Sequence, residues 1–334
     1  MTWLKFLTIS IALLVLFNLS LSIGIINLSL FDIYTALFGE TTPERIAAEL
    51  RLSRTTTALA VGVILGAAGA ALQSVLRNPL ASPYTIGIPQ SAALGVALGL
   101  FIGDVGYIAR GYLEIVNMPL VIFLAFLSAL VNVFIVLALA ALGGLSPVSI
   151  ILAMVAVSAI YQSAIALMQY LFLNDLQTAA VVYWTFGDVG RTNLGESMFL
   201  SLLALSAVVV FWSLSNAYNL LTIGDDVAKT SGVDPRSLRI VTLVISAFYT
   251  AAAVSYVGVI GFVGLAAPNI ARPIFGGGHK KLIPASAAIG GMLLLAADIV
   301  GRALKPPVII PAGITMSFIG AAVVILVLLK MGRL

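Results

Sequence analysis

The chain has 334 residues, of which 61% are apolar and 9% are charged, and its formal net charge is +4. A soluble domain carries about 25% charged residues, and a chain of this length cannot bury so much apolar side chain within a water-soluble core. The composition excludes a soluble enzyme, a nucleic-acid-binding protein and a disordered scaffold, and it predicts a polytopic membrane protein.

Ten apolar runs predict ten transmembrane helices, because about 20 apolar residues cross a bilayer as a helix. The alternation typical of barrel strands is absent, so the fold class is all-α, in one domain over residues 1–334. The first run follows Lys5 as a signal peptide would, but its length and the lack of a cleavage site favour a first span. Residues 240–275 are too long for one crossing, and Gly258, Gly261 and Gly264 predict the break. The predicted spans are 6–26, 55–76, 84–103, 119–142, 148–173, 197–215, 240–257, 259–275, 284–301 and 308–329.

The motif RLSR, from Arg51 to Arg54, comes just before the second predicted span. Arginines at the start of a membrane helix commonly anchor it to lipid headgroups. A patch that binds acidic groups is the alternative interpretation.

Residues 73–90, QSVLRNPLASPYTIGIPQ, interrupt apolar sequence with three prolines and Asn78. Proline removes backbone hydrogen bonds, so this segment is expected to be irregular near a membrane face. It is either a tight turn between helices, which is the simpler interpretation, or part of a gate in a pore.

The polar stretch over residues 216–239, NAYNLLTIGDDVAKTSGVDPRSLR, is expected to form a rigid knob. Asp225 or Asp226 can begin a short helix, and Gly232 is well placed to end it. Asp234 followed by Pro235 predicts the start of a second short helix. Such a knob suits docking to another protein, although an ordinary amphipathic loop is the alternative.

Residues 258–286 hold glycines that can let membrane helices approach closely. His279, the only histidine, stands in the loop GGGHKK and is expected to be a solvated loop residue rather than a ligand. The chain has no cysteine, so no disulfide or thiolate metal site can form.

The predicted membrane interior is almost free of charge, since only Asp298 and Arg302 come close to it. Carriers driven by protons or sodium usually keep a charged group at mid-membrane to bind the coupling ion. The sequence also lacks a Gly-Lys pair and therefore a phosphate-cradling P-loop. If the chain transports, its energy is expected to come from another subunit.

The distribution of lysine and arginine predicts the orientation. With ten spans, both termini lie on one side, and that side holds 10 of the 17 basic residues. The excess predicts that both termini of this multi-pass protein lie in the cytoplasm. We expect the protein in the plasma (inner) membrane.

Six pieces of the sequence resemble, in order, the permease subunits of type II ABC importers, the FecCD-type family for iron–siderophore, haem and cobalamin. The pieces are RLSR at 51–54, QSVLRNPLASP at 73–83, GVIGFVGLAAPNIAR at 258–272, LIPAS at 282–286, ADIVGR at 297–302 and PAG at 311–313.

The resemblance implies the type II importer permease fold, with ten helices per subunit and a homodimer whose substrate path follows the twofold axis. It implies two ATP-binding cassette subunits, which would hold ATP and magnesium, and an extracytoplasmic substrate-binding protein. The remaining expected partner is membrane lipid, with no nucleic acid. The chain itself is then not an enzyme and carries no cofactor or metal. The expected cargo is a metal chelate (iron–siderophore, haem or cobalamin), with a molybdate-type oxyanion as the less favoured alternative.

The resemblance also implies roles for particular residues. The coupling loop at about 216–239 would contact the ATPase through Asp225, Asp226, Lys229, Gly232, Val233, Asp234, Pro235, Arg236 and Leu238. Arg51, Arg54 and Arg302 would dock the binding protein. Asn78, Leu80, Ser146, Pro147 and Val148 would form the cytoplasmic gate.

The chain departs from the family pattern at three places. Ser53 stands where a proline is frequent, Asn269 stands where a histidine is frequent, and Ile309 and Ile310 precede Pro311 in place of an acidic residue. The cargo therefore does not follow from the resemblance. A self-contained secondary transporter and a channel or scaffold are the alternative functions.

Overall fold

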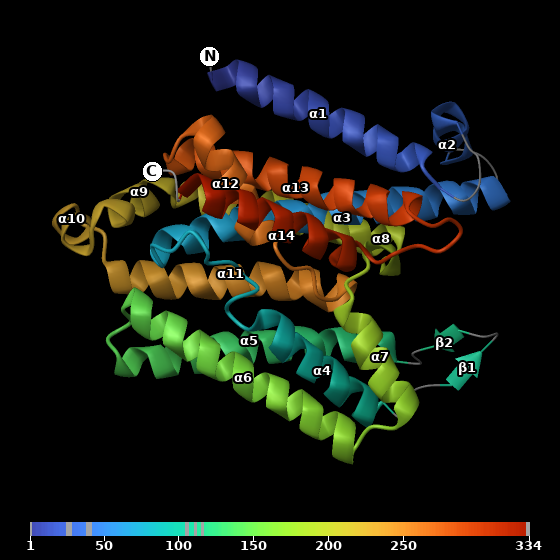
Figure 1. The fold of residues 1–334 in the computed structure, drawn as a ribbon, viewed down its shortest axis with the longest axis horizontal. Helices are drawn as coiled ribbons and strands as arrows, with labels where there is room; N and C mark the ends of the chain where they lie inside the picture. Colours follow the sequence, from blue (N-terminus) through green and yellow to red (C-terminus); the bar gives the residue numbers. More distant parts are fainter. Residues whose placement is uncertain are drawn as a thin grey trace. The chain divides into compact units, whose positions relative to one another are not determined.

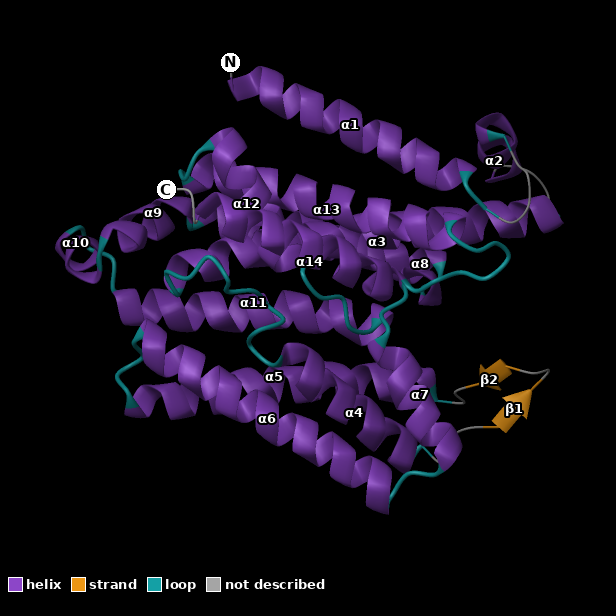
Figure 2. Ribbon diagram, viewed as in Figure 1, coloured by secondary structure: helices purple, strands orange, loops and turns teal. Residues whose placement is uncertain are grey.

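The structure is a computed structural model in which residues 2–24, 29–37, 42–103, 107–109, 112–114 and 117–331 are described. Helices make up most of these residues, and short loops join them (Figure 2). The contacts group the chain into two compact units. The first unit contains residues 1–70, 188–216 and 260–334, and the second contains residues 71–187 and 217–259.

The first unit is built around α13. Its elements are α1 (Thr2–Ser22), α2 (Leu30–Leu37), α3 (Pro43–Val75, of which 43–70 belong here), a 3-10 turn (Val189–Arg191), α8 (Leu194–Ser213), α12 (Val263–Phe275), α13 (His279–Ala303) and α14 (Ala312–Met331). Helix α13 packs against α1, α8, α12 and α14. Most of these helices are apolar all round, as expected of a protein in lipid.

Glycines let α3 lie backbone to backbone against its neighbours in the first unit. A Cβ built on Gly62 would stand 2.7 Å from the carbonyl carbon of Gly290, and one on Gly69 would stand 2.6 Å from that of Gly264. No side chain fits at such distances, so these positions require glycine. The close approach expected of the glycines in 258–286 is confirmed at Gly264.

The second unit is built around α5. Its elements are the end of α3, α4 (Ile88–Ile102), β1 (Tyr107–Ala109), β2 (Tyr112–Glu114), α5 (Met118–Leu142), α6 (Pro147–Leu171), α7 (Asp175–Thr185), α9 (Ser215–Ile223, from residue 217), α10 (Asp225–Thr230) and α11 (Pro235–Val257). Helix α5 lies against α4, α6 and α11 (Figure 1). The two strands form an antiparallel hairpin with Tyr107 opposite Glu114.

The predicted all-α membrane fold is confirmed, and the number of predicted spans roughly fits the structure. Each predicted span coincides with a helix, and seven helices among the described residues are long and apolar enough to cross a bilayer. Two further apolar helices, Ile88–Ile102 and Ala312–Leu326, are shorter. The break after Val257 is also confirmed, because Gly258 and Phe262 both take positive φ angles, +80° and +65°.

Two helix boundaries differ from the prediction. Helix α3 begins at Pro43 and not near residue 55. Its first three turns carry Glu44, Arg45 and Glu49, and these charged residues lower the hydropathy of the segment. A search for apolar runs therefore misses these turns. No second short helix starts at Asp234, because the helix that begins at Pro235 meets no breaking residue and continues as α11 to Val257.

Candidate functional site

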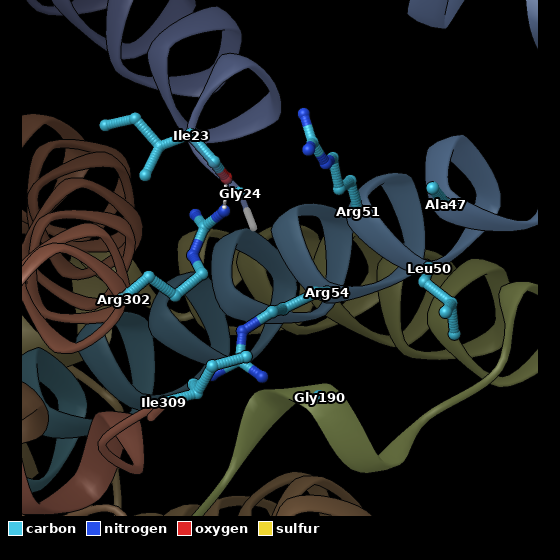
Figure 3. A pocket seen from close by; sticks show the side chains of 9 residues that line it. All are labelled: Ile23, Gly24, Ala47, Leu50, Arg51, Arg54, Gly190, Arg302 and Ile309. Atoms are coloured by element: carbon cyan, nitrogen blue, oxygen red, sulfur yellow. Dashed lines mark hydrogen bonds between the residues drawn. The ribbon is translucent and has the colours of Figure 1, made fainter. Parts of the chain in front are cut away.

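Three arginines that the sequence scatters over about 250 positions line one cavity in the first unit. Arg51 and Arg54 extend from α3 and Arg302 extends from α13; Arg302 reaches toward Ile23, and Arg54 turns toward Ile309 (Figure 3). The cavity has a volume of about 290 Å³. Its other lining residues are Gly24, Ala47, Leu50, Gly190 and Ile309. We call Arg51, Arg54 and Arg302 the arginine cluster.

A buried carboxylate joins two members of the arginine cluster. Asp298 is fully buried, and its two oxygens lie 2.7 Å from Arg54 Nε and 2.9 Å from Arg302 Nη2. Arg54 Nη2 also forms an ion pair with Asp188 at 3.0 Å. Buried charges need such partners, because an unpaired ion is costly in a low dielectric. The network therefore connects α3, α13 and the turn before α8.

The other bonds of the arginine cluster go to the last turn of α1. Arg51 Nη1 donates to the carbonyls of Leu21 and Ser22 at 3.2 and 3.3 Å. Arg302 donates to the carbonyls of Ser20 and Ile23 and, at 2.7 Å, to Ser20 Oγ. The last four carbonyls of a helix have no partner within it and favour cations. The two guanidinium groups therefore act as the C-terminal cap of α1.

The predicted docking residues therefore do lie together, but they are largely covered in the single chain. Arg51 and Arg302 are 8% and 7% exposed, and the side chain of Arg54 is 12% exposed. Their expected role in docking a binding protein stays a prediction. The headgroup-anchor alternative is not favoured, because both Arg51 and Arg54 line the cavity and lie about two and three turns inside α3.

The predicted coupling loop forms a compact turn in the second unit. Helix α10 begins at Asp225 as expected, and Gly232, with a φ of +82°, follows its end. Asp234 caps α11, since its carboxylate accepts hydrogen bonds from the backbone of Arg236 and Ser237 at 3.4 and 3.0 Å. Among the predicted coupling residues, Asp226, Lys229, Gly232, Asp234 and Arg236 are exposed, Asp225 and Val233 are half-buried, and Pro235 and Leu238 are buried.

Two arginines that sequence reasoning missed hold this turn in place. Arg239 Nη2 donates to both oxygens of Asp225 at 2.7 and 3.0 Å, and Arg77 Nη2 donates to the same carboxylate. Arg239 Nε reaches the carbonyl of Val75 at 3.2 Å, and Arg77 Nε reaches that of Leu221 at 2.9 Å. Hydrogen bonding to Arg239 holds the pKa of Asp225 below its ordinary value, and the charges of Arg239, Arg77 and Lys229 act in the same direction. Arg77 and Asp225 are 148 residues apart, so no local pattern could have paired them.

Both segments predicted to form a gate flank the coupling loop within the second unit. Asn78 Oδ1 accepts a hydrogen bond from the backbone of Leu80 at 2.9 Å, next to Arg77. Ser146 caps α6, whose first residue is Pro147, and Val148 is 67% exposed. A methyl group on Gly144, in the same turn, would lie 3.9 Å from Arg236 Nη2. The irregular backbone expected near Asn78 is confirmed, whereas the gating role stays a prediction.

A second cavity, of about 360 Å³, lies within the second unit. Its side chains come from α4, α6, α7 and the turns beside them: Tyr84, Pro89, Gln90, Ala93, Gln162, Ile165, Ala166, Gln169, Thr185 and Val259. None of these lining residues is charged. The Oε1 atom of Gln90 is buried without a hydrogen-bond partner among the described residues. We call this space the glutamine cavity.

The expectation that His279 is solvated is wrong. The side chain is only 3% exposed. His279 is the first residue of α13 and so belongs to the helix, not to the loop that ends just before it. Among the described residues no group of three or more histidine, aspartate or glutamate side chains is placed to hold a metal ion.

Comparisons with known proteins identify the family of the chain. The sequence model of the FecCD transport family matches residues 12–330. An ABC transporter permease protein of Methanocaldococcus jannaschii is 38% identical over 93% of this chain and 90% of its own length. The Fe(3+)-citrate import system permease of Bacillus subtilis is 33% identical over 95% of this chain and 92% of its own. The solved structure of a metal-chelate type ABC transporter, in an inward-facing conformation, has a TM-score of 0.82 and 27% identity, covering 97% of this chain and 98% of that one.

Proposed function

Because the chain belongs to the FecCD transport family, we propose that it forms the translocation path of an ATP-driven importer for a metal chelate. It is a multi-pass membrane protein and a permease subunit of the ABC type. The observation that carries the proposal is the family match over residues 12–330, together with the fold similarity over 97% of the chain. The cargo follows from the relatives, which include a permease for Fe(3+)-citrate and a metal-chelate transporter. Iron–siderophore, haem and cobalamin are the candidate chelates.

The energy for import comes from two separate ATP-binding cassette subunits. The sequence has no Gly-Lys pair and therefore no P-loop of its own, so ATP and magnesium bind to those subunits. The permease accordingly has no catalytic residue. It needs a second copy of itself, because the proposed path runs between two subunits, and a binding protein that delivers the chelate.

The coupling loop transmits the motion of the ATPase to the membrane helices. Its exposed residues, Asp226, Lys229 and Arg236 among them, form the surface that contacts the ATPase. Asp225, which both Arg77 and Arg239 hold, ties α10 to the turn after α3 and to α11. A displacement of α10 therefore acts at once on α11 and on the turn that follows α3. The adjacent residues Asn78, Leu80 and Ser146–Val148 are placed to open or close the path in response.

The glutamine cavity forms part of the path through which the chelate passes. Its amide and hydroxyl groups can exchange hydrogen bonds with the oxygen atoms of a chelate, and no charge would trap an anionic or cationic cargo. A permease that receives its ligand from a binding protein needs such weak contacts, because a deep binding site would slow release. This placement supports transport of a bulky polar chelate over that of a small oxyanion, which would favour positively charged groups.

The two ends of α3 lie at opposite membrane faces, with both chain termini on the cytoplasmic side. From Arg54 to Val75 the helix rises about 32 Å, close to the thickness of the hydrocarbon core. The coupling loop, which contacts Val75, takes the cytoplasmic side because its proposed partner is the ATPase. The arginine cluster takes the outer side because its proposed partner is the binding protein.

The test is transport by the reconstituted system. The permease, the two ATPase subunits and the binding protein are placed in liposomes, and uptake of radiolabelled ferric chelates, haem and cobalamin is measured with and without ATP. We expect accumulation against a gradient that needs ATP, the binding protein and one class of chelate. Accumulation driven by an imposed ion gradient without ATP would show a secondary transporter, and equilibration without accumulation would show a channel.

A further inference from the structure

A group of basic side chains gathers at the end of the first unit where α1 and α13 begin. Lys5 Nζ donates to the carbonyl of Ile274 at 2.6 Å, and the rings of Phe6 and Phe275 lie 4.6 Å apart. These contacts hold the start of α1 against the end of α12. Lys280 and Lys281, in the first turn of α13, are exposed, and Arg272 is half-buried. We call Lys5, Arg272, Lys280 and Lys281 the basic patch.

Two indole rings accompany the basic patch. Trp212, near the end of α8, is 49% exposed and donates from Nε1 to the carbonyl of Lys280 at 3.1 Å. Trp3, two residues before Lys5, is 71% exposed. Tryptophan is enriched at the level of lipid headgroups, because its ring is apolar and its N–H is polar. The rings therefore indicate that the basic patch lies at the membrane–water interface.

The described acidic residues of the first unit lie toward the other ends of its helices. On α13, Asp298 is 19 residues beyond His279, a rise of about 28 Å. On α8, Glu196 is in the first turn and Trp212 is near the last residue. Among the described residues, no carboxylate forms an ion pair with Lys5, Lys280 or Lys281. The described carboxylates of the unit therefore do not neutralise the positive charge of the basic patch.

The loop between α12 and α13 leaves room for a ligand beside these charges. Gly276, Gly277 and Gly278 are exposed, and a Cβ built on any of them would meet nothing within 4 Å. Gly278 is the N-cap of α13, so the positive end of the helix dipole lies beside this open loop. Such a helix end favours an anion, and the two lysines add formal charge.

We propose that the basic patch, with Trp212 beside it, binds the headgroup of an anionic phospholipid in the leaflet at which α1 begins. The phosphate lies between Lys280, Lys281 and the α12–α13 loop, and the acyl chains run along the apolar surface of the helices. A protein partner would be expected to bring carboxylates to the patch, but the exposed tryptophans and their interfacial position favour lipid. The binding does not depend on the proposed transport function, because it needs neither cargo nor ATP.

The test is lipid binding to the full chain, purified in a neutral detergent and followed by native mass spectrometry. Phosphatidylglycerol and phosphatidylcholine are titrated separately, and inorganic phosphate is the third probe. The variant is Lys280→Gln with Lys281→Gln, and the matched control is Arg45→Gln with Lys305→Gln, which removes two positive charges outside the basic patch. A lysine near an anionic membrane surface contributes about fivefold to affinity. We therefore expect phosphatidylglycerol to bind the variant roughly 25-fold more weakly and the control within about twofold of wild type.

Three results would overturn the proposal. Equal affinity for phosphatidylglycerol and phosphatidylcholine would mean that the patch does not select an anionic headgroup. Competition by inorganic phosphate at equal concentration would point to a free-anion site. Unchanged phosphatidylglycerol binding in the lysine variant, with loss of ATPase-subunit binding in the same preparation, would assign the patch to a protein contact.

The elution volume and the thermal midpoint, both measured without added lipid, confirm that each variant is folded. Trp212→Phe is a second test variant. It keeps an apolar ring, and we expect it to bind anionic lipid with weaker selectivity.

Discussion

Arg239 donates two hydrogen bonds to the carboxylate of Asp225, although Arg239 is 2% exposed and the Asp225 side chain is 36% exposed. A buried cation is thus neutralised by an acid at the surface of the coupling loop. Because Arg239 belongs to α11 and also binds the carbonyl of Val75, the pair joins a surface helix to the interior of the second unit.

Replacing Asp225 by asparagine should both destabilise the protein and weaken coupling. Arg239 would stay buried with no opposite charge from α10, and we expect a loss of about 1–2 kcal/mol, because the exposed carboxylate is partly screened by water. Thermal unfolding in detergent measures the loss, and the ratio of chelate imported to ATP hydrolysed measures coupling. Asp226→Asn is the stability control, since Asp226 is exposed and forms no ion pair among the described residues. Equal thermal midpoints for the two variants would contradict the structural role of the pair.

The same carboxylate predicts a loss of stability in acid. Its pKa lies below the ordinary value of 3.8, chiefly because of the hydrogen bond from Arg239. A group whose pKa is lower in the folded than in the unfolded protein contributes stability above the unfolded value and loses it as the pH falls through the folded value. Above about pH 5, we expect protonation of Asp225 to have no effect on the rate of amide hydrogen exchange in α10. Below pH 3.8, exchange in α10 should become faster than the pH dependence of exchange in an unstructured peptide accounts for. In Asp225→Asn that acid acceleration should be absent.

Gly232 is expected to tolerate no other residue without cost. Its φ of +82° is unfavourable for residues with a Cβ, and because nothing lies within 4 Å of a built Cβ, the cost is purely conformational. Gly232→Ala should lower the free energy of unfolding by about 1 kcal/mol. Gly232→Pro, which requires a negative φ, should rearrange the loop and uncouple ATP hydrolysis from transport in a folded dimer. Gly277→Ala is the control, since that position is equally open and has no positive φ. Normal transport by Gly232→Pro would argue strongly against the coupling assignment.

Asp298→Asn should be far more damaging than the loss of a surface ion pair. The change leaves Arg54 and Arg302 beside each other without the carboxylate that they share, and breaking a buried pair costs about 3–5 kcal/mol. Glu49→Gln is the comparison, because its pair with Arg45 is more than one-third exposed on both sides and contributes about 0.5 kcal/mol or less. Unfolding by a denaturing detergent measures both. A difference below about 1 kcal/mol would mean that the buried network contributes little.

The glutamine cavity gives a prediction for transport itself. Gln162→Leu with Gln169→Leu keeps the approximate volume of the side chains but removes their amides, so uptake of a polar chelate should fall while ATPase stimulation by the binding protein persists. Leu167→Ala, on the same helix but outside the cavity lining, should transport normally. The initial rate of ATP-dependent uptake in liposomes is the measurement. Unchanged uptake in the double glutamine variant would place the path elsewhere.

The local features of the sequence predicted most of the helices. Runs of apolar residues identify membrane helices because each run must satisfy its backbone hydrogen bonds within itself. The break near Gly258 and the short helix at Asp225 followed from turn and capping chemistry that acts within a few residues. The same reasoning failed at the charged start of α3, where Glu44, Arg45 and Glu49 lower the hydropathy of residues that are nevertheless helical. The short helices α2, α7 and α9 escaped a scan for runs long enough to cross a membrane.

Composition and order of motifs thus determined, without a structure, that this chain is a helical membrane protein of an importer family. Only the tertiary structure decided which charges meet: Asp298 with Arg54 and Arg302, Asp225 with Arg77 and Arg239, and Lys5 with the end of α12. Each apolar segment forms a membrane helix independently of the others, so the hydropathy of the sequence predicts the helices one by one. Ion pairs depend on distances between side chains that stand up to 244 residues apart, and those distances exist only after the helices have packed.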